Sequence, residues 1–489
     1  MSTVPASPSL LKGAVARLAP VVPLLRELGD RFAARGHELA LVGGPVRDAF
    51  IGRMSPDLDF TTDATPDETL AAVAGWADAT WEIGRAFGTI GVRKGPLQLE
   101  ITTYRSDVYD RSSRKPEVAF GHSLSDDLVR RDFTVNAMAL RLPSLEFVDE
   151  HDGLADLAAR RLRTPAAPQD SFADDPLRML RAARFASQLG FSVAPQVEAA
   201  MTAQAATLEI VSAERIRDEL VKLLLSDAPR AGLTLLVDTG LAQVFLPELP
   251  ALQLEVDEHH HHKDVYQHSL TVLEQAIALE GPRRVPGVTH PETVDGPDLR
   301  LRLAALLHDI GKPATRRFED GGGVSFHHHE VVGAKLTSKR LKALRFDKSV
   351  VADVSRLVEL HLRFHGYGTG EWTDSAVRRY VTDAGPLLPR LHLLTRSDST
   401  TRNARKAARL ARTYDELEAR IEQLKAQEEL AAVRPELDGR QIGEILGVAP
   451  GRVIGEAYRY LLALRLDEGV LGPEVARERL LAWWAAREG

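Results

Sequence analysis

The sequence predicts an α+β domain in the N-terminal part of the chain, followed by domains built only of helices. From about residue 36 to 150, short segments typical of strands are interleaved with helical segments. From about residue 165 onward the pattern is helical and rich in Ala and Leu, with Arg interspersed. The 489 residues are enough for about three or four domains.

The composition narrows the class of protein. Hydrophobic residues make up 44% of the chain and charged residues 27%, which is typical of a soluble globular protein. The net charge is −7, so any contact with nucleic acid must rely on local basic patches. The absence of cysteine excludes disulfides, zinc–thiolate sites and cysteine nucleophiles, and it fits a cytoplasmic protein. Pro20 and Pro23 interrupt the first apolar stretch, so we expect neither a signal peptide nor a membrane span.

The individual elements follow from local patterns. Residues 10–35 predict one amphipathic helix, and the predicted strands are residues 37–42, 57–62, 88–93 and 97–105. Pro247, Pro250 and the run from His259 to His262 mark a linker, residues 281–298 a loop and residues 321–323 a tight turn. The predicted parts are an N-terminal helix, a head, a neck, a further helical domain and a tail, over residues 1–35, 36–165, 166–255, 256–400 and 401–489.

Two segments of the head carry the strongest chemical signal, namely Leu41-Val-Gly-Gly-Pro-Val-Arg-Asp48 and Asp57-Leu-Asp59. The first predicts a strand, a glycine turn and a helix start, where backbone N–H groups favour phosphate. In the second, Asp57 and Asp59 lie at i and i+2 of a strand, so both carboxylates point to one face and can share a divalent cation. Oxygen ligands suit Mg²⁺. Together the segments predict nucleotidyl transfer.

A third carboxylate often completes such a site. Glu100 lies opposite to Leu99 and Ile101 on the strand over residues 97–105 and is a candidate. The alternative is an exposed strand residue without a role.

Two further segments suit a nucleotide. Arg130-Arg-Asp-Phe-Thr-Val-Asn-Ala137 offers groups for a triphosphate and for ribose hydroxyls, although a helix start with surface arginines is the alternative. Asp175 and Arg178 lie at i and i+3 of a predicted helix with Pro176 in its first turn. Cytosine and adenine both present an amine donor beside a ring-nitrogen acceptor. A carboxylate with a guanidinium therefore accepts CTP and ATP and rejects UTP and GTP. The alternative is an ordinary helical salt bridge.

A second constellation lies further along, in the order His268, His308-Asp309 and Asp398. The segment Leu303-Ala-Ala-Leu-Leu-His-Asp-Ile-Gly-Lys-Pro313 predicts an apolar helix that ends in His-Asp. His329 and His361 add further imidazoles. Imidazole and carboxylate ligands together suit a transition metal such as Ni, Mn, Fe or Zn. A structural hydrogen-bonded pair is the alternative.

The helix predicted after Thr401 has a basic face. Its cationic residues are Arg402, Arg405, Lys406, Arg409 and Arg412. This spacing suits an RNA backbone, although a solvated helix face is equally consistent with it.

Six segments, in family order, resemble the bacterial-type (class II) tRNA nucleotidyltransferases, which are the CCA-adding enzymes of the polymerase-β-like nucleotidyltransferase superfamily. They cover roughly residues 36–225. The segments are Gly43-Gly44 with Arg47-Asp48, Asp57 with Asp59, Arg130-Arg131-Asp132, Asp152-Gly-Leu-Ala-Asp-Leu-Ala-Ala-Arg-Arg-Leu-Arg163, Asp175 with Arg178, and Ser212-Ala-Glu-Arg-Ile-Arg217. In the tail, Pro435-Glu-Leu-Asp-Gly439 and Leu446-Gly-Val-Ala-Pro-Gly451 also resemble this family, and the histidine constellation resembles the HD superfamily of metal-dependent phosphohydrolases.

The resemblance implies a polymerase-β-like nucleotidyltransferase head followed by all-α neck, HD and tail domains. It implies that Asp57 and Asp59 hold catalytic Mg²⁺, that Gly44 and Arg47 contact the triphosphate, and that Arg131 contacts the nucleotide near ribose and phosphate. It further assigns Asp175 and Arg178 as the protein template for C and A, Arg181 and Arg184 to nucleotide phosphate or ribose, and residues 152–163 as the flexible element that switches from CTP to ATP. Asp174 departs from the Glu that is usual in the family.

In the HD domain the resemblance implies one metal held by His268, His308, Asp309 and Asp398, with His329 and His361 serving a second. The implied activity is addition of C, C and A to the 3′ end of tRNA from CTP and ATP with release of pyrophosphate. The HD site would hydrolyse 2′,3′-cyclic phosphates or phosphomonoesters. The rivals are a CC-only, A-only or poly(A) enzyme, and an HD phosphohydrolase with an inactive RNA-binding head. The oligomeric state stays open.

Overall fold

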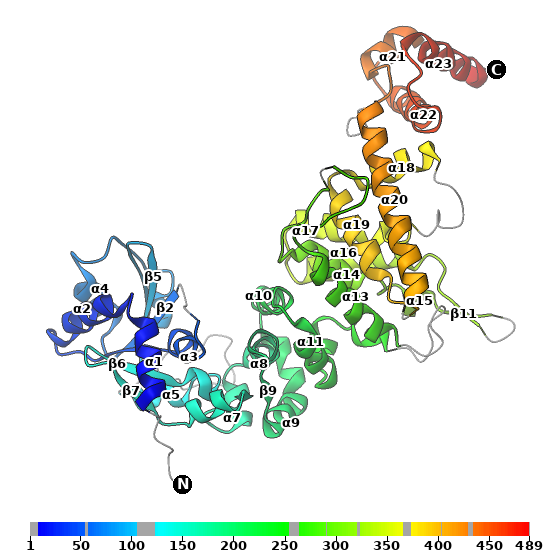
Figure 1. Cartoon of the computed structure of the whole chain (residues 1–489). Helices are drawn as coiled ribbons and strands as arrows, with labels where there is room; N and C mark the ends of the chain where they lie inside the picture. Colours follow the sequence, from blue (N-terminus) through cyan, green and yellow to red (C-terminus); the bar gives the residue numbers. More distant parts are fainter. Residues whose placement is uncertain are drawn as a thin grey trace. The chain divides into compact units, whose positions relative to one another are not determined.

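The computed structural model describes residues 8–53, 57–104, 123–253, 264–289, 291–319, 323–364, 373–401, 403–428 and 434–488. The chain divides into two compact units, Met1–Phe245 and Leu246–Gly489, each of which is described by itself (Figure 1). No helix in the described ranges is long and apolar enough to cross a membrane. The run from His259 to His262 lies outside the described residues.

A seven-stranded mixed sheet forms the centre of the head, in the order β3-β4-β5-β2-β1-β6-β7. Neighbouring strands are antiparallel except β2 and β5, which pair in parallel. The strands are β1 (Leu39–Val42), β2 (Asp57–Thr62), β3 (Ala79–Trp81), β4 (Thr89–Lys94), β5 (Leu97–Thr103), β6 (Met138–Leu142) and β7 (Glu146–Asp149). The prediction for β2 is confirmed residue for residue, β1, β4 and β5 are confirmed with shifted ends, and β3, β6 and β7 were missed.

Two helices, not one, precede the sheet. They are α1 (Pro8–Leu18) and α2 (Val22–Ala33), so the prediction of a single helix over residues 10–35 is wrong. Pro20 explains the break, because proline lacks an N–H and its ring clashes with the preceding turn. Pro23 lies in the first turn of α2, where it is tolerated. Leu25, Leu28 and Phe32 of α2 are buried.

The other helices of the head are short. They are α3 (Gly44–Phe50), α4 (Pro66–Val73), α5 (Leu124–Val129) and α6 (Gly153–Ala158), with 3-10 turns η1 (Arg85–Phe87) and η2 (Thr134–Asn136). Thr65 and Glu68 form a capping box that fixes the start of α4.

The neck completes the first unit. Its helices are α7 (Pro168–Asp174), α8 (Leu177–Leu189), α9 (Pro195–Gln204), α10 (Ala213–Leu224), α11 (Pro229–Asp238) and α12 (Leu241–Phe245), with the 3-10 turn η3 (Ala205–Ile210). α8 packs against both α10 and α11, so it forms the core of the neck. A short parallel pair, β8 (Arg161–Leu162) with β9 (Ser192–Val193), joins the end of the head to the neck.

The second unit is helical, as predicted, apart from one small hairpin. Its elements are η4 (Pro250–Leu252), α13 (Val265–Leu279), α14 (Leu299–Leu307), α15 (Lys312–Thr315), β10 (Arg317–Phe318), β11 (Val324–Ser325), α16 (His329–Ala343), α17 (Lys348–Leu360), α18 (Asp374–Ala384), η6 (Gly385–Leu387), α19 (Leu388–Asp398) and α20 (Ala404–Glu428). α14 is central, since it contacts α13, α17 and α19. Residues 281–289 and 291–298 form the expected loop, whereas residues 321 and 322 of the expected turn lie outside the described residues.

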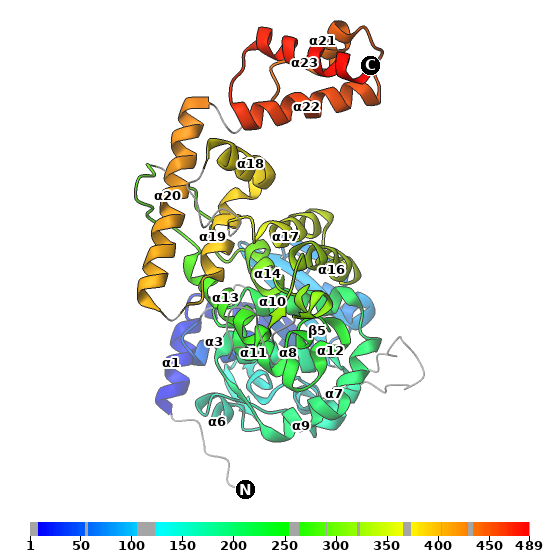
Figure 2. The same cartoon turned by 90° about the vertical axis from the view of Figure 1, so that its right-hand side faces the viewer.

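The C-terminal part of this unit is a small helical tail of α21 (Gly439–Leu446), α22 (Arg452–Glu468) and α23 (Pro473–Glu488) (Figure 2). Leu437, Ile442, Ala457, Leu461 and Leu480 form its apolar core. An α+β head followed by helical domains is therefore confirmed.

Candidate functional site

The first candidate site lies on the face of the sheet shared by β2 and β5. Asp57 and Asp59 point to one face of β2, and Asp59 is the register partner of Glu100 in the parallel pair. Glu100 is exposed between the buried Leu99 and Ile101, as the sequence predicted. Three carboxylates therefore share one face at the end of the head sheet.

The charge of this cluster acts on Asp59. Burial raises the pKa of Asp59, the charge of Arg131 opposes this, and the carboxylates of Glu100 and Asp57 raise the pKa further. A raised carboxylate pKa means that the ionised form lacks compensating positive charge. A divalent cation held by these oxygens would supply that charge, and an all-oxygen donor set fits Mg²⁺.

Gly43 brings the backbone close to this cluster. It has φ of +72°, a left-handed conformation that glycine adopts readily. A Cβ at this position would lie 3.1 Å from Nη1 of Arg131 and 4.0 Å from Oδ2 of Asp59. Arg131 is itself held by Asp127, whose Oδ2 accepts from its Nη2 at 3.0 Å. The predicted strand, glycine turn and helix start are thus present, and they border the carboxylates.

A chain of buried hydrogen bonds joins α3 to α8. Nη1 of Arg47 donates to Oδ1 of Asn136 at 2.6 Å, and Nδ2 of Asn136 donates to Oδ1 of Asp132 at 2.9 Å. Oδ2 of Asp132 accepts from Nε of Arg181 at 2.7 Å. Burial acts to raise the pKa of Asp132, but the charge of Arg181 and the hydrogen bonds outweigh it and hold this pKa well below its usual range. Two arginines expected to bind nucleotide therefore belong to one network.

Three arginines surround Phe185 of α8, namely Arg47 and Arg181 of this network and, in addition, Arg184. The guanidinium carbons of Arg47, Arg181 and Arg184 lie 5.3, 5.5 and 4.0 Å from the centre of its ring. Nε of Arg184 also donates to Glu219 of α10 at 2.6 Å. Cation–π contacts thus gather one arginine of the head and two of the neck around one ring.

Asp175 and Arg178 are close in sequence but do not pair with each other. Asp175 lies between α7 and α8, and its Oδ2 accepts from Nη2 of Arg215 at 2.9 Å. Arg178 donates to Oγ of Ser171 at 2.9 Å and to the carbonyl of Arg130 at 2.6 Å. The ordinary helical salt bridge considered as an alternative is therefore not formed.

The segment over residues 152–163, expected to be a flexible element, forms α6 and β8. Asp156 is fully buried at its centre and accepts hydrogen bonds from Thr134, Arg161 and Arg163 at 2.6–2.9 Å. The bond from Thr134 ties the segment to the 3-10 turn that precedes β6, and the bonds from Arg161 and Arg163 join α6 to the end of the same segment.

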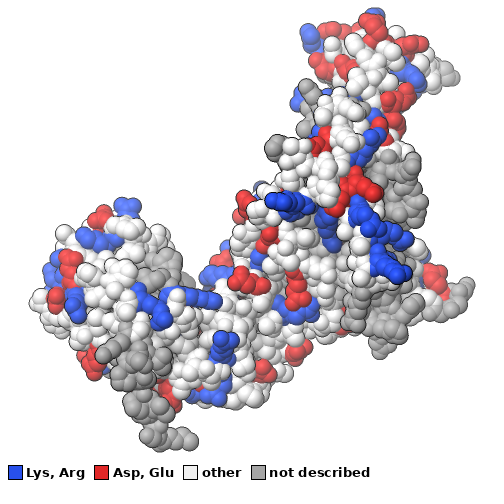
Figure 3. Space-filling model, viewed as in Figure 1, with Lys and Arg blue, Asp and Glu red and all other residues white. Residues whose placement is uncertain are grey.

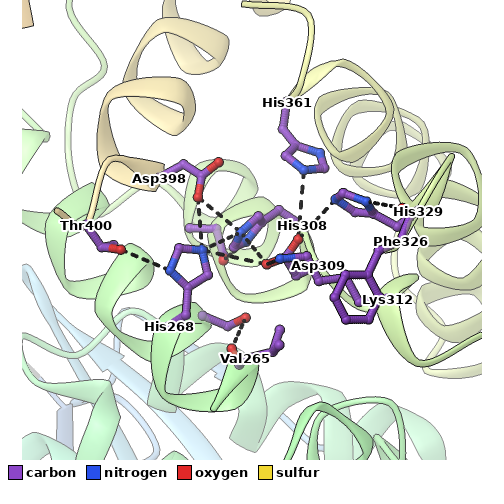
Figure 4. Close-up of polar contacts among 12 residues, drawn as sticks. Val265, His268, His308, Asp309, Lys312, Phe326, His329, His361, Asp398 and Thr400 are labelled. Atoms are coloured by element: carbon purple, nitrogen blue, oxygen red, sulfur yellow. Dashed lines mark hydrogen bonds and ion pairs between the residues drawn. The ribbon is translucent and has the colours of Figure 1, made fainter. Parts of the chain in front are cut away.

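The second candidate site is a buried cluster of imidazoles and carboxylates in the second unit (Figure 4). All the expected ligands meet there: His268 from α13, His308 and Asp309 from the end of α14, His329 from the start of α16, His361 from the end of α17 and Asp398 from the end of α19. They form two groups with metal-compatible geometry, His268 with His308 and Asp398, and Asp309 with His329 and His361.

Asp309 lies between the two groups. Its Oδ2 is 3.2 Å from Nε2 of His308, and its Oδ1 is 3.3 Å from Nε2 of His329 and 4.0 Å from Nε2 of His361. The resemblance assigned Asp309 to the first metal alone. The structure instead places one carboxylate oxygen toward each group.

The backbone orients the imidazole rings. Nδ1 of His308, His329 and His361 lies 2.9, 2.8 and 2.6 Å from the carbonyl oxygen three residues earlier. A ring that donates from Nδ1 presents the lone pair of Nε2, which is the arrangement that metal-binding histidines use. Nδ1 of His268 similarly lies 3.2 Å from Oγ1 of Thr400.

The electrostatics of the cluster favour a bound cation. Nε2 of His329 and Nε2 of His361 are buried and make no hydrogen bond. Burial and the charge of His308 lower the pKa of His361 to about 3. For His308, burial acts to lower the pKa, but Asp309 and Asp398 outweigh it and raise the pKa to about 10. His308 therefore carries positive charge beside Asp309 and Asp398 when no metal is bound. A transition metal would supply that charge in its place and would bind imidazole and carboxylate ligands together.

Sequence reasoning missed several residues that shape these sites. Lys312 was quoted only as part of the segment after His-Asp, but its Nζ lies 3.0 Å from Oδ2 of Asp309. Gly311 allows α16 to pack closely, because a Cβ at this position would lie 2.1 Å from the carbonyl oxygen of His329. Asn136 and Arg215 lie within motif segments identified in the sequence. No local sequence pattern marked Glu219 as part of the site.

The expected basic face is present at the start of α20. Arg405, Lys406, Arg409 and Arg412 are all exposed, whereas Arg402 lies outside the described residues. Figure 3 shows Lys and Arg gathered along this part of the helix.

Comparisons with known proteins match family models to the regions that contain these two sites. Three family models match, namely the "Poly A polymerase head domain" over residues 39–163, the "Probable RNA and SrmB- binding site of polymerase A" over residues 190–252, and the HD domain over residues 265–403. The fold and the sites therefore define a nucleotidyltransferase head joined to an HD domain.

Individual relatives identify the family more closely than the domain models do. The chain is 35% identical to the A-adding tRNA nucleotidyltransferase of Deinococcus radiodurans over 455 residues, which is 91% of this chain and 95% of the relative. It is 31% identical to the CC-adding tRNA nucleotidyltransferase of Thermus thermophilus over 455 residues, which is 91% and 94%. The fold resembles that of the Bacillus stearothermophilus CCA-adding enzyme in complex with CTP, with a TM-score of 0.63, 23% identity and coverage of 96% and 98%. The chain belongs to the family of tRNA nucleotidyltransferases.

Proposed function

We propose that the head adds C, C and A to the 3′ end of tRNA from CTP and ATP and releases pyrophosphate. The observation that carries this proposal is the shared face of Asp57, Asp59 and Glu100 beside the turn at Gly43. The 3′-hydroxyl oxygen bonds to the α-phosphorus, the bond from the α-phosphorus to the bridging oxygen breaks, and the hydroxyl proton is lost to water. This reaction needs positioned phosphates and compensated charge more than covalent chemistry by the protein.

The residues of this site have distinct proposed roles. Asp57 and Asp59 would hold Mg²⁺, which supplies charge compensation for the attacking and leaving oxygens. The N–H of Gly44 and the guanidinium of Arg47 hold the triphosphate, and Arg131 contacts ribose and phosphate. Glu100 supplies a third carboxylate.

Base selection is proposed to rest on Asp175 and Arg178, with Arg181 and Arg184 binding phosphate or ribose. Asp175 pairs with Arg215 and Arg178 contacts Ser171, so both side chains exchange partners when a base binds. The cost of an unpaired buried polar group then disfavours UTP and GTP. Residues 152–163 are proposed to adjust the site between C and A addition.

A second candidate is partial addition, and a specific observation favours it. Two relatives that match over most of the chain are named A-adding and CC-adding tRNA nucleotidyltransferase. The deciding experiment incubates the protein and Mg²⁺ with tRNA ending at the discriminator base, with CTP alone, with ATP alone, or with both. Two additions with CTP and a third only with both support CCA synthesis. CC alone, A alone or a long A tail selects the corresponding partial enzyme.

We propose that the HD domain is a phosphohydrolase that uses a transition metal, of which Ni, Mn, Fe and Zn are candidates. The buried cluster of imidazoles and carboxylates around Asp309 supports this. The substrates are 2′,3′-cyclic phosphates or phosphomonoesters at damaged tRNA ends, and Lys312 is placed to neutralise phosphate beside Asp309. His308→Ala should abolish hydrolysis and spare nucleotide addition, whereas loss of addition by the same variant would contradict separate sites.

The partners follow from this chemistry. The exposed cations of α20 are proposed to contact the tRNA backbone, because such contacts need shape and charge, not base sequence. Since tRNA is the substrate, we place the reaction in the cytoplasm.

A further inference from the structure

The β10–β11 hairpin begins and ends beside the metal cluster of the HD domain. It follows α15, whose first residue is Lys312, and it leads through Phe326 to His329 (Figure 1). Nζ of Lys312 lies 5.6 Å from the centre of the Phe326 ring and 3.0 Å from Oδ2 of Asp309 (Figure 4). The segments that lead into and out of the hairpin therefore both lie beside the metal cluster.

The hairpin presents an exposed aromatic ring. Phe318 keeps 75% of its surface exposed, and it pairs with Val324, which lies two residues before Phe326. Two residues span about 7 Å along a strand, so Phe318 lies about one nucleotide length from Phe326, whose ring contacts Lys312 beside Asp309. The guanidinium carbon of Arg316 lies 4.7 Å from the centre of the Phe318 ring.

Two cations, Arg316 and Arg317, directly precede this ring in the sequence. Within the described part of the chain, Arg316 makes no ion pair, and its Nε is buried without a hydrogen bond. Arg317 is exposed and likewise forms no ion pair with a described residue. The carboxylate of Glu319 accepts from Oγ of Ser325. The hairpin therefore combines an exposed aromatic ring with two arginines, one of which lies against the ring.

We infer that this hairpin binds the last nucleotides of an RNA 3′ end and delivers the terminal phosphate to the HD metal site. A base stacks on Phe318, and Arg316 and Arg317 contact the backbone phosphates. Stacking tolerates any base because every base has a π face, which suits an enzyme that acts on many RNA ends. This inference rests on the proposed hydrolase, and it assigns the hairpin as the part of the chain that recognises the RNA end.

The test uses the full chain loaded with metal and a short oligoribonucleotide that ends in a 2′,3′-cyclic phosphate. The matched probe is the same oligonucleotide with its last two nucleotides abasic. In the wild type, we expect KM to be about tenfold lower for the intact RNA. Phe318→Ala should remove this difference by raising KM for the intact RNA, whereas kcat stays within twofold and Phe318→Trp restores binding. Arg316→Gln should reduce the salt dependence of KM for both RNAs.

Phe87 offers a matched control, since it exposes 51% of its surface on the head, and Phe87→Ala should leave both KM values unchanged. Equal KM values for the two RNAs in the wild type, or no effect of Phe318→Ala, would overturn the inference while leaving the hydrolase in place. Absence of hydrolysis in the wild type would instead reject the proposed hydrolase. Fluorescence anisotropy with the same two RNAs then decides whether Phe318 binds a base.

Discussion

Nη1 of Arg47 and Oδ1 of Asn136 lie 2.6 Å apart and join two segments separated by 89 positions in the sequence. Through Asp132, this contact continues to Arg181 of α8. The arginine proposed for the triphosphate is therefore positioned by the helix proposed to read the base. Binding of the base and binding of the phosphates are therefore structurally coupled.

Asn136→Ala should impair nucleotide addition through Arg47. Losing a hydrogen bond to a charged group costs about 1.5–3 kcal/mol, so we expect kcat/KM for CTP to fall about tenfold or more. Steady-state kinetics with CTP and with ATP measure the effect, and thermal unfolding checks that the head stays folded. Wild-type kinetics in a folded variant would show that Arg47 does not depend on Asn136.

Replacing each carboxylate tests whether that residue takes part in metal binding. Asp59→Ala should lower kcat for addition by about 10³-fold or more while leaving HD hydrolysis intact. Glu100→Gln should lower kcat if Glu100 is the third carboxylate. Gln98→Ala is the control, because Gln98 is exposed on the same face of β5. If Glu100→Gln and Gln98→Ala behave alike, Glu100 has no part in the reaction.

Arg178→Ala should weaken discrimination between bases. A mismatched buried polar group costs about 1–3 kcal/mol, so the preference for CTP over UTP should fall about tenfold. Competition between labelled CTP and UTP for addition to one tRNA measures this ratio directly. An unchanged ratio would reject Arg178 as part of the template.

Gly311→Ala should disturb the HD metal site without touching the head. The added Cβ would meet the carbonyl oxygen of His329 at 2.1 Å, and overpacking of this kind costs about 1–3 kcal/mol. The melting temperature of the second unit and its metal content should both fall. Gly455→Ala is the matched control, since nothing lies within 4 Å of a Cβ there and alanine favours α22.

Removing the metal should destabilise one unit selectively. A ligand that binds only the folded state stabilises it by mass action, so chelation should lower the melting temperature of the second unit. Differential scanning calorimetry in excess Mg²⁺, with and without a chelator selective for transition metals, should show an unchanged transition for the first unit. His308→Ala should weaken the response to chelator, and a response equal to that of the wild type would place the metal elsewhere.

The sequence predicted what depends on short-range pattern. The strand at Asp57 and Asp59 and the opposite orientation of Glu100 follow from period-two alternation, and the structure has both. The pairing of Asp175 with Arg215, 40 positions away, depends on how α8 packs against α10, which no local pattern encodes. The prediction of one helix across Pro20 was wrong because the amphipathic pattern continues past this residue, although the helix does not.

The backbone carbonyls that hold Nδ1 of His308, His329 and His361 have a further consequence. Each ring is aligned by its own turn of backbone and not by the other ligands. Losing one ligand therefore leaves the others aimed at the same point, and affinity for the ion declines in steps without collapse of the cluster. A chain stripped of its ion can reload with little reorganisation, which makes this centre suited to exchange with whichever suitable cation its surroundings supply.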